Sequence, residues 1–407
     1  MKRTRATVGM LVLFLAAMPL AGTSWGAEAA TPESRPSFAR RLQPFVDSHS
    51  LAGAVLLVAS RDRVLSLEAV GFADIAANAL MRTDCLFWIA SMSKPMTALA
   101  LMMLVDEGKV NLDDPVEKYL PEFRGQMLVA EQDENHVLLK KPPRPITVRD
   151  VLSHTSGLPY MSRVENRIDS RPLREAVLSY AMTPLKFAPM SKYDYSNAGI
   201  NTAGRIIEVV SGMPYEEFMQ KRLFEPLGMK DTTFSLTEEQ LKRLAKSCKP
   251  GPNNTGLVET QIGQLTYPLT SPKRYPSPAG GLFSTAADVG VFCRMVLNGG
   301  ILDGKRYVSE AAVRQLTSTQ TGDLLNGGKG EHGYGLGWST SRKTQGETGP
   351  VIVGGCGHGG AYSTNMSIDP QRQLVTVFMV QHAGFPGPDG GKVQPTFNQA
   401  VNEAFPK

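Results

Sequence analysis

Apolar and polar positions follow two different periods along this chain. Strand-like runs lie near both ends. Residues 54–59 and 64–70 are mostly apolar and are separated by the polar turn 60–63, so they predict an antiparallel hairpin. After residue 300, further runs alternate or stay apolar and predict strands at 335–340, 351–354, 361–368 and 374–380.

Helical periodicity dominates the middle of the chain. Apolar residues recur at helical spacing in the segments 33–50, 147–152, 172–182, 198–211, 214–223, 236–246, 289–297 and 393–405. Residues 126–141 read as an inserted hairpin, and 248–280 as loops with room for one more hairpin. The expected fold is therefore α+β: an antiparallel sheet flanked by terminal helices, with an inserted helical lobe. We expect an α/β lobe from 38–90 and 275–405, and a helical lobe from 91–270.

The first 29 residues have a different character. Lys2, Arg3 and Arg5 precede an apolar stretch at 8–21, and Ala27-Glu28-Ala29 offers a small-x-small cleavage site. This pattern is typical of a secretory signal peptide and is too short for a stable membrane span. We therefore expect an exported protein, periplasmic or secreted, with no stable membrane span after cleavage.

Composition, charge and residue spacing argue against nucleic acid, a metal or a cofactor as a partner. The 407 residues are 42% hydrophobic and 20% charged, enough for a sizeable core, and the formal net charge of +5 is too mild to favour nucleic acid. The four cysteines allow three disulfide pairings: Cys85, Cys248, Cys293 and Cys356. Cys85 and Cys293 lie in apolar runs and also read as small core residues. No metal-ligand spacing occurs, so neither a metal nor a cofactor is expected.

The first candidate for chemistry is Ser91-Met92-Ser93-Lys94. An apolar run at 85–90 ends at Ser91, and a helix begins there that is apolar on every side from 98 to 105. Lys94 lies one turn after Ser91 on the same face, and a buried ammonium tends to lose its proton. Such a lysine can help to activate a serine hydroxyl. The alternative is an ordinary helix cap followed by a solvated lysine.

Two further stretches present polar groups at turns. Tyr195 and Asn197 lie two residues apart at the entrance to the helix 198–211, where an ordinary turn is the alternative. His358 stands in the glycine-rich run 354–361, where a structural histidine is the alternative. So many glycines permit close approach of the backbone to another group, such as a ligand.

In this order, Ser91-x-x-Lys94, Tyr195-x-Asn197 and His358-x-Gly360 resemble the three motifs of the serine beta-lactamase/penicillin-binding-protein superfamily. The nearest branch resembles class C beta-lactamases, family VIII carboxylesterases and D-aminopeptidase or D-Ala-D-Ala carboxypeptidase relatives. The resemblance covers about residues 38–400.

The resemblance implies roles for individual residues. Ser91 would be the nucleophile and Lys94 its neighbour. Tyr195 would be the general base, either as a phenolate or through protons shared with Lys94. Asn197 would orient the substrate amide or Lys94, and the N–H groups of Ser91 and Ala361 would form the oxyanion hole. The resemblance leaves His154 a structural role in its turn.

The third motif departs from the pattern of class C beta-lactamases. His358 and Gly359 replace a lysine and a threonine that hold the substrate carboxylate, and Lys343-Thr344 reads as a loop decoy. Histidine is mostly neutral near pH 7.5, so we expect a preference for neutral substrates, and better use of anionic ones as pH falls from about 8 to 6.

The sequence thus predicts an exported serine hydrolase that forms an acyl-enzyme on a small ester, amide or D-amino-acid peptide. Esterase activity is the first choice, ahead of a D-peptidase of the D-Ala-D-Ala carboxypeptidase type or a weak beta-lactamase. A catalytically silent penicillin-binding-like protein remains the alternative from another class, although the intact Ser91, Lys94 and Tyr195 argue against it.

Overall fold

The computed structural model describes residues 37–325, 332–341 and 354–406. The predicted signal peptide lies outside these residues, as do Lys343, Thr344 and most of the strand expected at 351–354. Within the described residues, no helix is long and apolar enough to cross a membrane.

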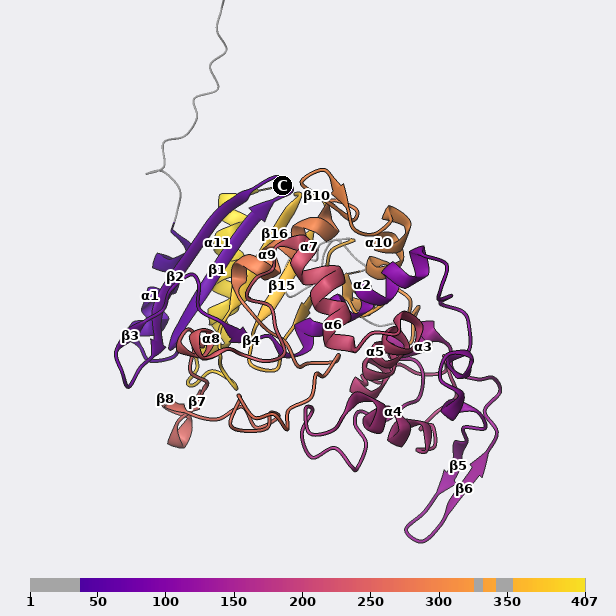
Figure 1. The fold of residues 1–407 in the computed structure, drawn as a ribbon. Helices are drawn as coiled ribbons and strands as arrows, with labels where there is room; N and C mark the ends of the chain where they lie inside the picture. Colours follow the sequence, from indigo (N-terminus) through magenta and orange to yellow (C-terminus); the bar gives the residue numbers. More distant parts are fainter. Residues whose placement is uncertain (1–36, 326–331, 342–353, 407) are drawn as a thin grey trace, which may run out of the picture. The chain divides into compact units, whose positions relative to one another are not determined.

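An antiparallel sheet of eight strands forms the centre of the fold, in the order β12-β13-β14-β15-β16-β1-β2-β3 (Figure 1). Strands β1 (Gly53–Ser60) and β2 (Val64–Asp74) confirm the predicted N-terminal hairpin, and β1 also pairs with β16 (Leu374–Met379). The remaining strands of the sheet are β3 (Ala79–Leu80), β12 (His332–Tyr334), β13 (Ser339–Ser341), β14 (Cys356–Gly359) and β15 (Asn365–Asp369). The structure confirms the predicted α+β class.

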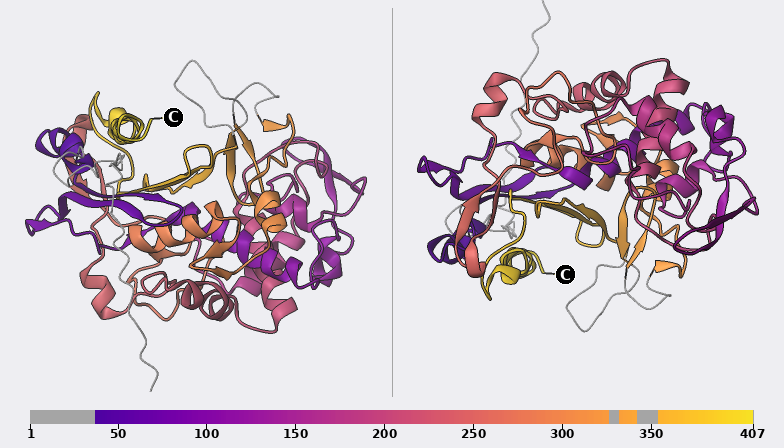
Figure 2. Two further views of the ribbon diagram at one scale, coloured as in Figure 1. Left: turned by 90° about the horizontal axis from the view of Figure 1, so that it is seen from above. Right: turned by 90° about the horizontal axis from the view of Figure 1, so that it is seen from below.

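Both faces of β1 are buried, which explains its continuous apolar sequence. Alternate residues face α1 (Phe38–Asp47) and α11 (Val393–Ala404) on one side, and α9 (Ala286–Leu297) on the other. Figure 2 shows the sheet between these helices, with α11 in yellow on one face and α9 in orange on the other. The terminal helices pack together through Phe38 and Phe397, whose rings lie 5.8 Å apart.

Helices and short hairpins fill the chain between β3 and α9. The helices of this region are α2 (Ser93–Asp106), α3 (Val148–Leu152), α4 (Leu173–Ala181), α5 (Asn197–Ser211), α6 (Tyr215–Met219), α7 (Glu225–Leu227) and α8 (Glu238–Lys242). The predicted hairpin insertion is confirmed as β5 (Leu128–Gln132) with β6 (Val137–Lys140), and the loop region contains β7 (Cys248–Pro250) with β8 (Leu257–Glu259). Smaller pairs join β4 (Phe87–Trp88) to β9 (Phe283–Ser284), and β10 (Ile301–Leu302) to β11 (Lys305–Arg306).

Two predicted strands are wrong in their bounds, and one helix was not predicted. The segment 335–340 contains a tight turn with Gly337 at φ 76°, so β12 and β13 lie on either side of it. In the segment 361–368 the strand starts only at Asn365, because a turn closed by Gly360 N–H donating to Thr364 O (2.7 Å) comes first. Helix α10 (Glu310–Thr317) is capped by Ser309, whose hydroxyl accepts from Ala312 N–H at 3.0 Å.

All four cysteines are buried free thiols, so none of the three disulfide pairings is formed. Cys85 and Cys293 lie in the main core, as the apolar runs around them suggested. The thiol of Cys293 lies 3.5 Å from the sulfur of Met366, which places it against the sheet.

Candidate active site

Ser91 stands where β4 gives way to helix α2. A single 3₁₀ turn, Ala90–Met92, connects them. Ala90 has a φ of +47°, a left-handed conformation that costs about 1–2 kcal/mol for a residue with a side chain. Two contacts hold this turn in place: Ser93 Oγ donates to Ala90 O at 2.7 Å, and Trp88 Nε1 donates to Gly280 O at 2.7 Å. The surrounding fold therefore fixes the direction of the Ser91 side chain.

Lys94 is completely buried beside Ser91. Its Nζ lies 3.0 Å from Ser91 Oγ and 2.7 Å from the carbonyl oxygen of Ala279. Burial lowers the pKa of Lys94 well below its ordinary value because the charged form loses its hydration. A neutral amine carries a lone pair, so Lys94 can accept the proton of the Ser91 hydroxyl.

Tyr195 closes the other side of Ser91 and Lys94. Its ring centroid lies 4.7 Å from Lys94 Nζ. Burial raises the pKa of Tyr195, although a hydrogen bond with Ser91 acts in the opposite direction. The phenol therefore keeps its proton at neutral pH, and Lys94 is the better proton acceptor of the two. The electrostatics thus favour the shared-proton interpretation of Tyr195 over a phenolate base.

His154 supports the turn that carries Tyr195, a contact that the sequence did not reveal. Its Nδ1 accepts from the Ser196 N–H at 3.2 Å, and its ring lies 4.4 Å from that of Tyr195. Burial is the main cause that lowers the pKa of His154 well below its ordinary value, so the ring is neutral. Helix α5, which follows this turn, is capped by Ser196, whose hydroxyl accepts from Gly199 N–H at 3.0 Å and donates to Pro159 O at 2.6 Å.

Asn197 is the first residue of α5 and is only 6% exposed. Its Oδ1 is buried and has no hydrogen-bond donor among residues 37–325, 332–341 and 354–406. A buried acceptor without a donor costs about 1–3 kcal/mol, so this atom is suited to a donor supplied by a bound molecule.

His358 lies in β14 with both ring nitrogens occupied. Nδ1 is 2.8 Å from Gly359 O, and Nε2 is 3.0 Å from Tyr334 Oη. Because a carbonyl oxygen only accepts, Nδ1 carries the proton and Nε2 accepts from the Tyr334 hydroxyl. Burial is the main cause that lowers the pKa of His358 to about 3. The expectation that this ring gains charge between pH 8 and 6 is therefore wrong.

Gly360 explains part of the glycine-rich run. A Cβ at this position would lie 2.0 Å from Thr364 Oγ1 and 2.6 Å from Ile89 O. The close approach that glycine permits here is thus to the protein's own backbone just before Ser91, rather than to a ligand. This contact brings the turn that contains Ala361 next to the segment that carries Ser91. The role of the Ala361 N–H in an oxyanion hole remains a prediction.

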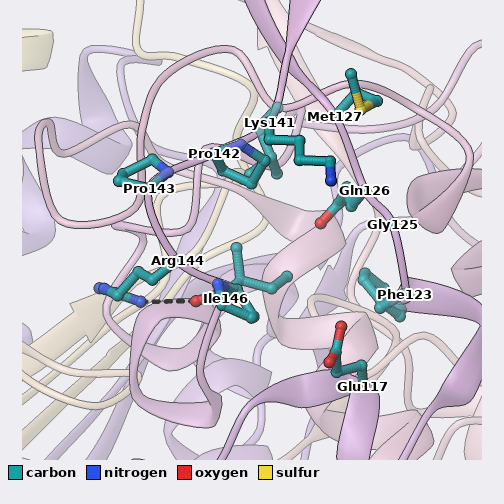
Figure 3. A pocket seen from close by; sticks show the side chains of 12 residues that line it. Glu117, Phe123, Gly125, Gln126, Met127, Lys141, Pro142, Pro143, Arg144 and Ile146 are labelled. Atoms are coloured by element: carbon teal, nitrogen blue, oxygen red, sulfur yellow. Dashed lines mark hydrogen bonds between the residues drawn. The ribbon is translucent and has the colours of Figure 1, made fainter.

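A cavity of ≈ 320 Å³ lies elsewhere, at the base of the β5–β6 hairpin. Figure 3 shows Lys141 extending toward Gln126, with Pro142 and Pro143 on the other side. None of the three motifs contributes to its lining. In the part of the chain that the structure describes, no group of three or more His, Cys, Asp or Glu residues could hold a metal ion.

The described site has the composition of a serine acyl-transfer centre, and comparison with known proteins agrees. The family model named Beta-lactamase matches residues 38–394, nearly the whole of the segment 38–400. The chain belongs to the beta-lactamase family.

Three relatives and one solved structure are informative. Protein Rv1367c of Mycobacterium tuberculosis is 32% identical, covering 83% of this chain and 87% of its own length. Esterase EstB of Burkholderia gladioli is 32% identical over 62% of this chain and 68% of its own. The carboxypeptidase/endopeptidase AmpH of Escherichia coli is 26% identical over 89% of each. The structure of EstCE1, a hydrolase with promiscuous acyltransferase activity, superposes with a TM-score of 0.76 at 24% identity, covering 89% of this chain and 98% of its own.

Proposed function

We propose that this protein is an exported serine hydrolase that cleaves small neutral esters through an acyl-enzyme on Ser91. The observation that carries the proposal is the 3.0 Å separation of Ser91 Oγ from the buried Lys94 Nζ. The similarity to an esterase at 32% identity supports the choice of substrate class. Export rests on the sequence pattern of the first 29 residues.

In the proposed reaction, Ser91 Oγ bonds to the ester carbonyl carbon while its proton passes to Lys94 Nζ. The carbonyl oxygen takes the negative charge and is stabilised by the N–H groups of Ser91 and Ala361. The proton then passes to the departing alcohol, with Tyr195 sharing it on the way, and the C–O bond to the alcohol breaks. Deacylation repeats these steps with water in the place of Ser91. The water oxygen bonds to the acyl carbon while one of its protons passes to Lys94 Nζ. The bond from that carbon to Ser91 Oγ then breaks, the acid is released, and the proton on Lys94 passes to Ser91 Oγ.

The preference for neutral esters follows from the third motif. His358 is buried and neutral, and Gly359 has no side-chain hydroxyl, so neither supplies a charge-assisted hydrogen bond to a substrate carboxylate. Such bonds contribute about 1.5–3 kcal/mol where they are present. A substrate without a carboxylate loses nothing at this position.

A second candidate function is hydrolysis of D-amino-acid peptides. The buried Asn197 Oδ1 has no donor within the described residues, and a substrate amide N–H would satisfy it where an ester oxygen could not. The similarity to AmpH over 89% of both chains supports this candidate.

The deciding experiment compares three substrates with one enzyme preparation: a short p-nitrophenyl ester, a D-Ala-D-Ala peptide and nitrocefin. We expect kcat/KM to be highest for the ester. A higher value for the peptide would favour the second candidate. A protein that turns over none of the three and does not react with a fluorescent fluorophosphonate would be a silent binding protein.

A further inference from the structure

A buried chain of hydrogen bonds connects Lys94 to residues far from the reacting atoms. The carbonyl oxygen of Ala279 accepts from Lys94 Nζ at 2.7 Å, and the Ala279 N–H donates to Asn201 Oδ1 at 3.0 Å. Asn201 Nδ2 then donates to the Tyr180 hydroxyl at 3.0 Å. The Tyr180 hydroxyl is also hydrogen-bonded to the carboxylate of Glu165.

The direction of each bond in this chain is fixed by chemistry. The Ala279 N–H can only donate, so the oxygen of the Asn201 amide must face it and the NH₂ group must face Tyr180. Tyr180 accepts from Asn201 and has one hydrogen left, which goes to Glu165. Asn201 is 3% exposed and Tyr180 is fully buried, so no water competes for these bonds.

Asn201 accepts from a peptide group whose oxygen is bonded, on the opposite side, by Thr97. The peptide between Pro278 and Ala279 presents its oxygen to Thr97 Oγ1 at 2.8 Å and its N–H to Asn201. Thr97 lies on α2, one turn beyond Lys94, whereas Asn201 lies on α5. The loop is thus fixed between two helices, and with it the position of the Ala279 carbonyl.

We propose that Asn201 is a positioning residue for Lys94, acting through Ala279. A neutral amine has two N–H groups and one lone pair. When the Ala279 carbonyl accepts one N–H, rotation about the last bond of Lys94 is restricted, and the lone pair can be held toward Ser91 Oγ. This inference rests on the proposed function, because it assumes that Lys94 accepts the Ser91 proton.

The test measures how fast a fluorophosphonate labels Ser91 in the full chain, as a rate constant at several pH values. Asn201→Leu removes both side-chain hydrogen bonds while keeping a similar volume. Thr202→Val is the matched control: Thr202 is the next residue of α5, is fully buried, and its hydroxyl donates within the helix to Ala198 O at 2.8 Å. Tyr180→Phe is a milder variant that removes the acceptor of the Asn201 NH₂ group, together with the hydrogen bond to Glu165, and leaves Asn201 itself in place.

We expect Asn201→Leu to slow labelling by about tenfold or more and to shift the midpoint of its pH profile, because a misplaced amine is a poorer base for Ser91. Tyr180→Phe should slow labelling by a smaller factor. Thr202→Val should keep the wild-type rate constant and midpoint even if it is less stable.

Labelling of Asn201→Leu at the rate and midpoint of Thr202→Val would overturn the positioning role. If Asn201→Leu does not fold, Tyr180→Phe decides, and an unchanged rate constant there overturns the role. A wild-type protein that is not labelled at all overturns the proposed function and this inference together. A labelled wild type with equally fast labelling of Asn201→Leu overturns the inference alone, so the two failures are distinguishable.

Discussion

Among single residues, Lys94 has the most unusual environment in the site. An ammonium at this position would be shielded from bulk water. Within residues 37–325, 332–341 and 354–406, the close partners of Lys94 Nζ are Ser91 Oγ, Ala279 O and the face of the Tyr195 ring. None of these carries a full negative charge, because burial keeps the phenol protonated. Lys94 is therefore held in this site as a neutral base rather than as a cation.

Ser91→Ala should abolish both turnover of an ester and covalent labelling, while the protein stays folded. The reason is that no other described group would replace the Oγ held 3.0 Å from Lys94, and loss of a nucleophile costs several orders of magnitude. Intact mass spectrometry after incubation with a fluorophosphonate checks this. A mass increase in the variant would place the nucleophile at another residue.

Tyr195→Phe should lower kcat by about 10²-fold or more and change KM little. The hydroxyl is hydrogen-bonded to Ser91 and shares the proton in transit, whereas the ring, which the variant keeps, provides the packing on His154. Steady-state kinetics on the p-nitrophenyl ester check this. A kcat near that of the wild type would mean that Lys94 passes the proton without help.

The ratio of kcat/KM for a neutral ester and its carboxylate-bearing partner should stay constant between pH 8 and 6. With its pKa lowered to about 3, His358 is neutral across this whole range and cannot begin to attract the carboxylate. Using a substrate pair that differs only in the carboxylate cancels effects on Lys94. A ratio that moves toward the anionic ester by about threefold or more would show that His358 titrates near its ordinary pKa of about 6.5.

Among single residues, the sequence indicated the three motifs but not the residues that hold the motif side chains in position. Ser91 and Lys94 could be found because they are close in sequence and lie at the start of an apolar helix. Ala279 is 185 residues away from Lys94, and Asn201 looks like any polar residue of an amphipathic helix. Contacts of this kind depend on the tertiary fold, which one sequence does not display.

Among the elements, strand β14 and the turn after it have the tightest packing requirement of the site. Gly360→Ala should destabilise the protein by about 1–3 kcal/mol, because the new Cβ would meet Thr364 Oγ1 and the Ile89 carbonyl at distances well inside contact. Gly359→Ala is the matched control, since its nearest neighbours lie at 3.7 Å. Urea unfolding of both variants checks this, and equal stability of the two would contradict it.

Elements with strong local signals were predicted, whereas the strands expected at 335–340 and 361–368 had the wrong bounds because each segment contains a turn. The hairpin of β1 and β2 has two apolar runs around a polar turn, and α9 has Thr285 as its cap, with the hydroxyl accepting from Asp288 N–H at 3.2 Å. The turn between β12 and β13 contains apolar residues because Leu336 and Trp338 are buried there. Because a buried turn and a buried strand both need apolar residues, an apolar run by itself does not distinguish the two.

For the molecule as a whole, three buried neutral histidines make stability sensitive to acid. Burial lowers the pKa of His358 to about 3 and that of His382 to about 4, and it is the main cause that lowers the pKa of His154 well below its ordinary value. The unfolded chain binds a proton at each of these residues below about pH 6.5, and the folded protein does not. The free energy of unfolding therefore falls as pH drops through this window, by up to about 1.4 kcal/mol per pH unit for each histidine.

We expect a net loss of about 3 kcal/mol between pH 6.5 and 5 in urea unfolding. Asp288 offsets part of this loss. Burial raises its pKa to about 6, so between pH 6.5 and 5 the folded protein binds a proton at Asp288 that the unfolded chain does not bind. Of these three histidines, His382 is the one that lies outside the active site. His382→Gln should therefore make the free energy of unfolding depend less steeply on pH. Stability that stays level or rises toward pH 5 would contradict this account.

The pairing of β1 with β16 has a consequence for synthesis of the protein. Strand β1 is made long before its neighbour β16, and the Ala52 N–H donates to His382 Nε2 across 330 residues. A nascent chain on the ribosome therefore cannot complete the sheet until β16 has been made, nor bring the turn after β14 against Ile89 until that turn has been made. Ser91 stays without its full surroundings until then, so a chain truncated before β16 should have no hydrolase activity, even though every motif residue is present.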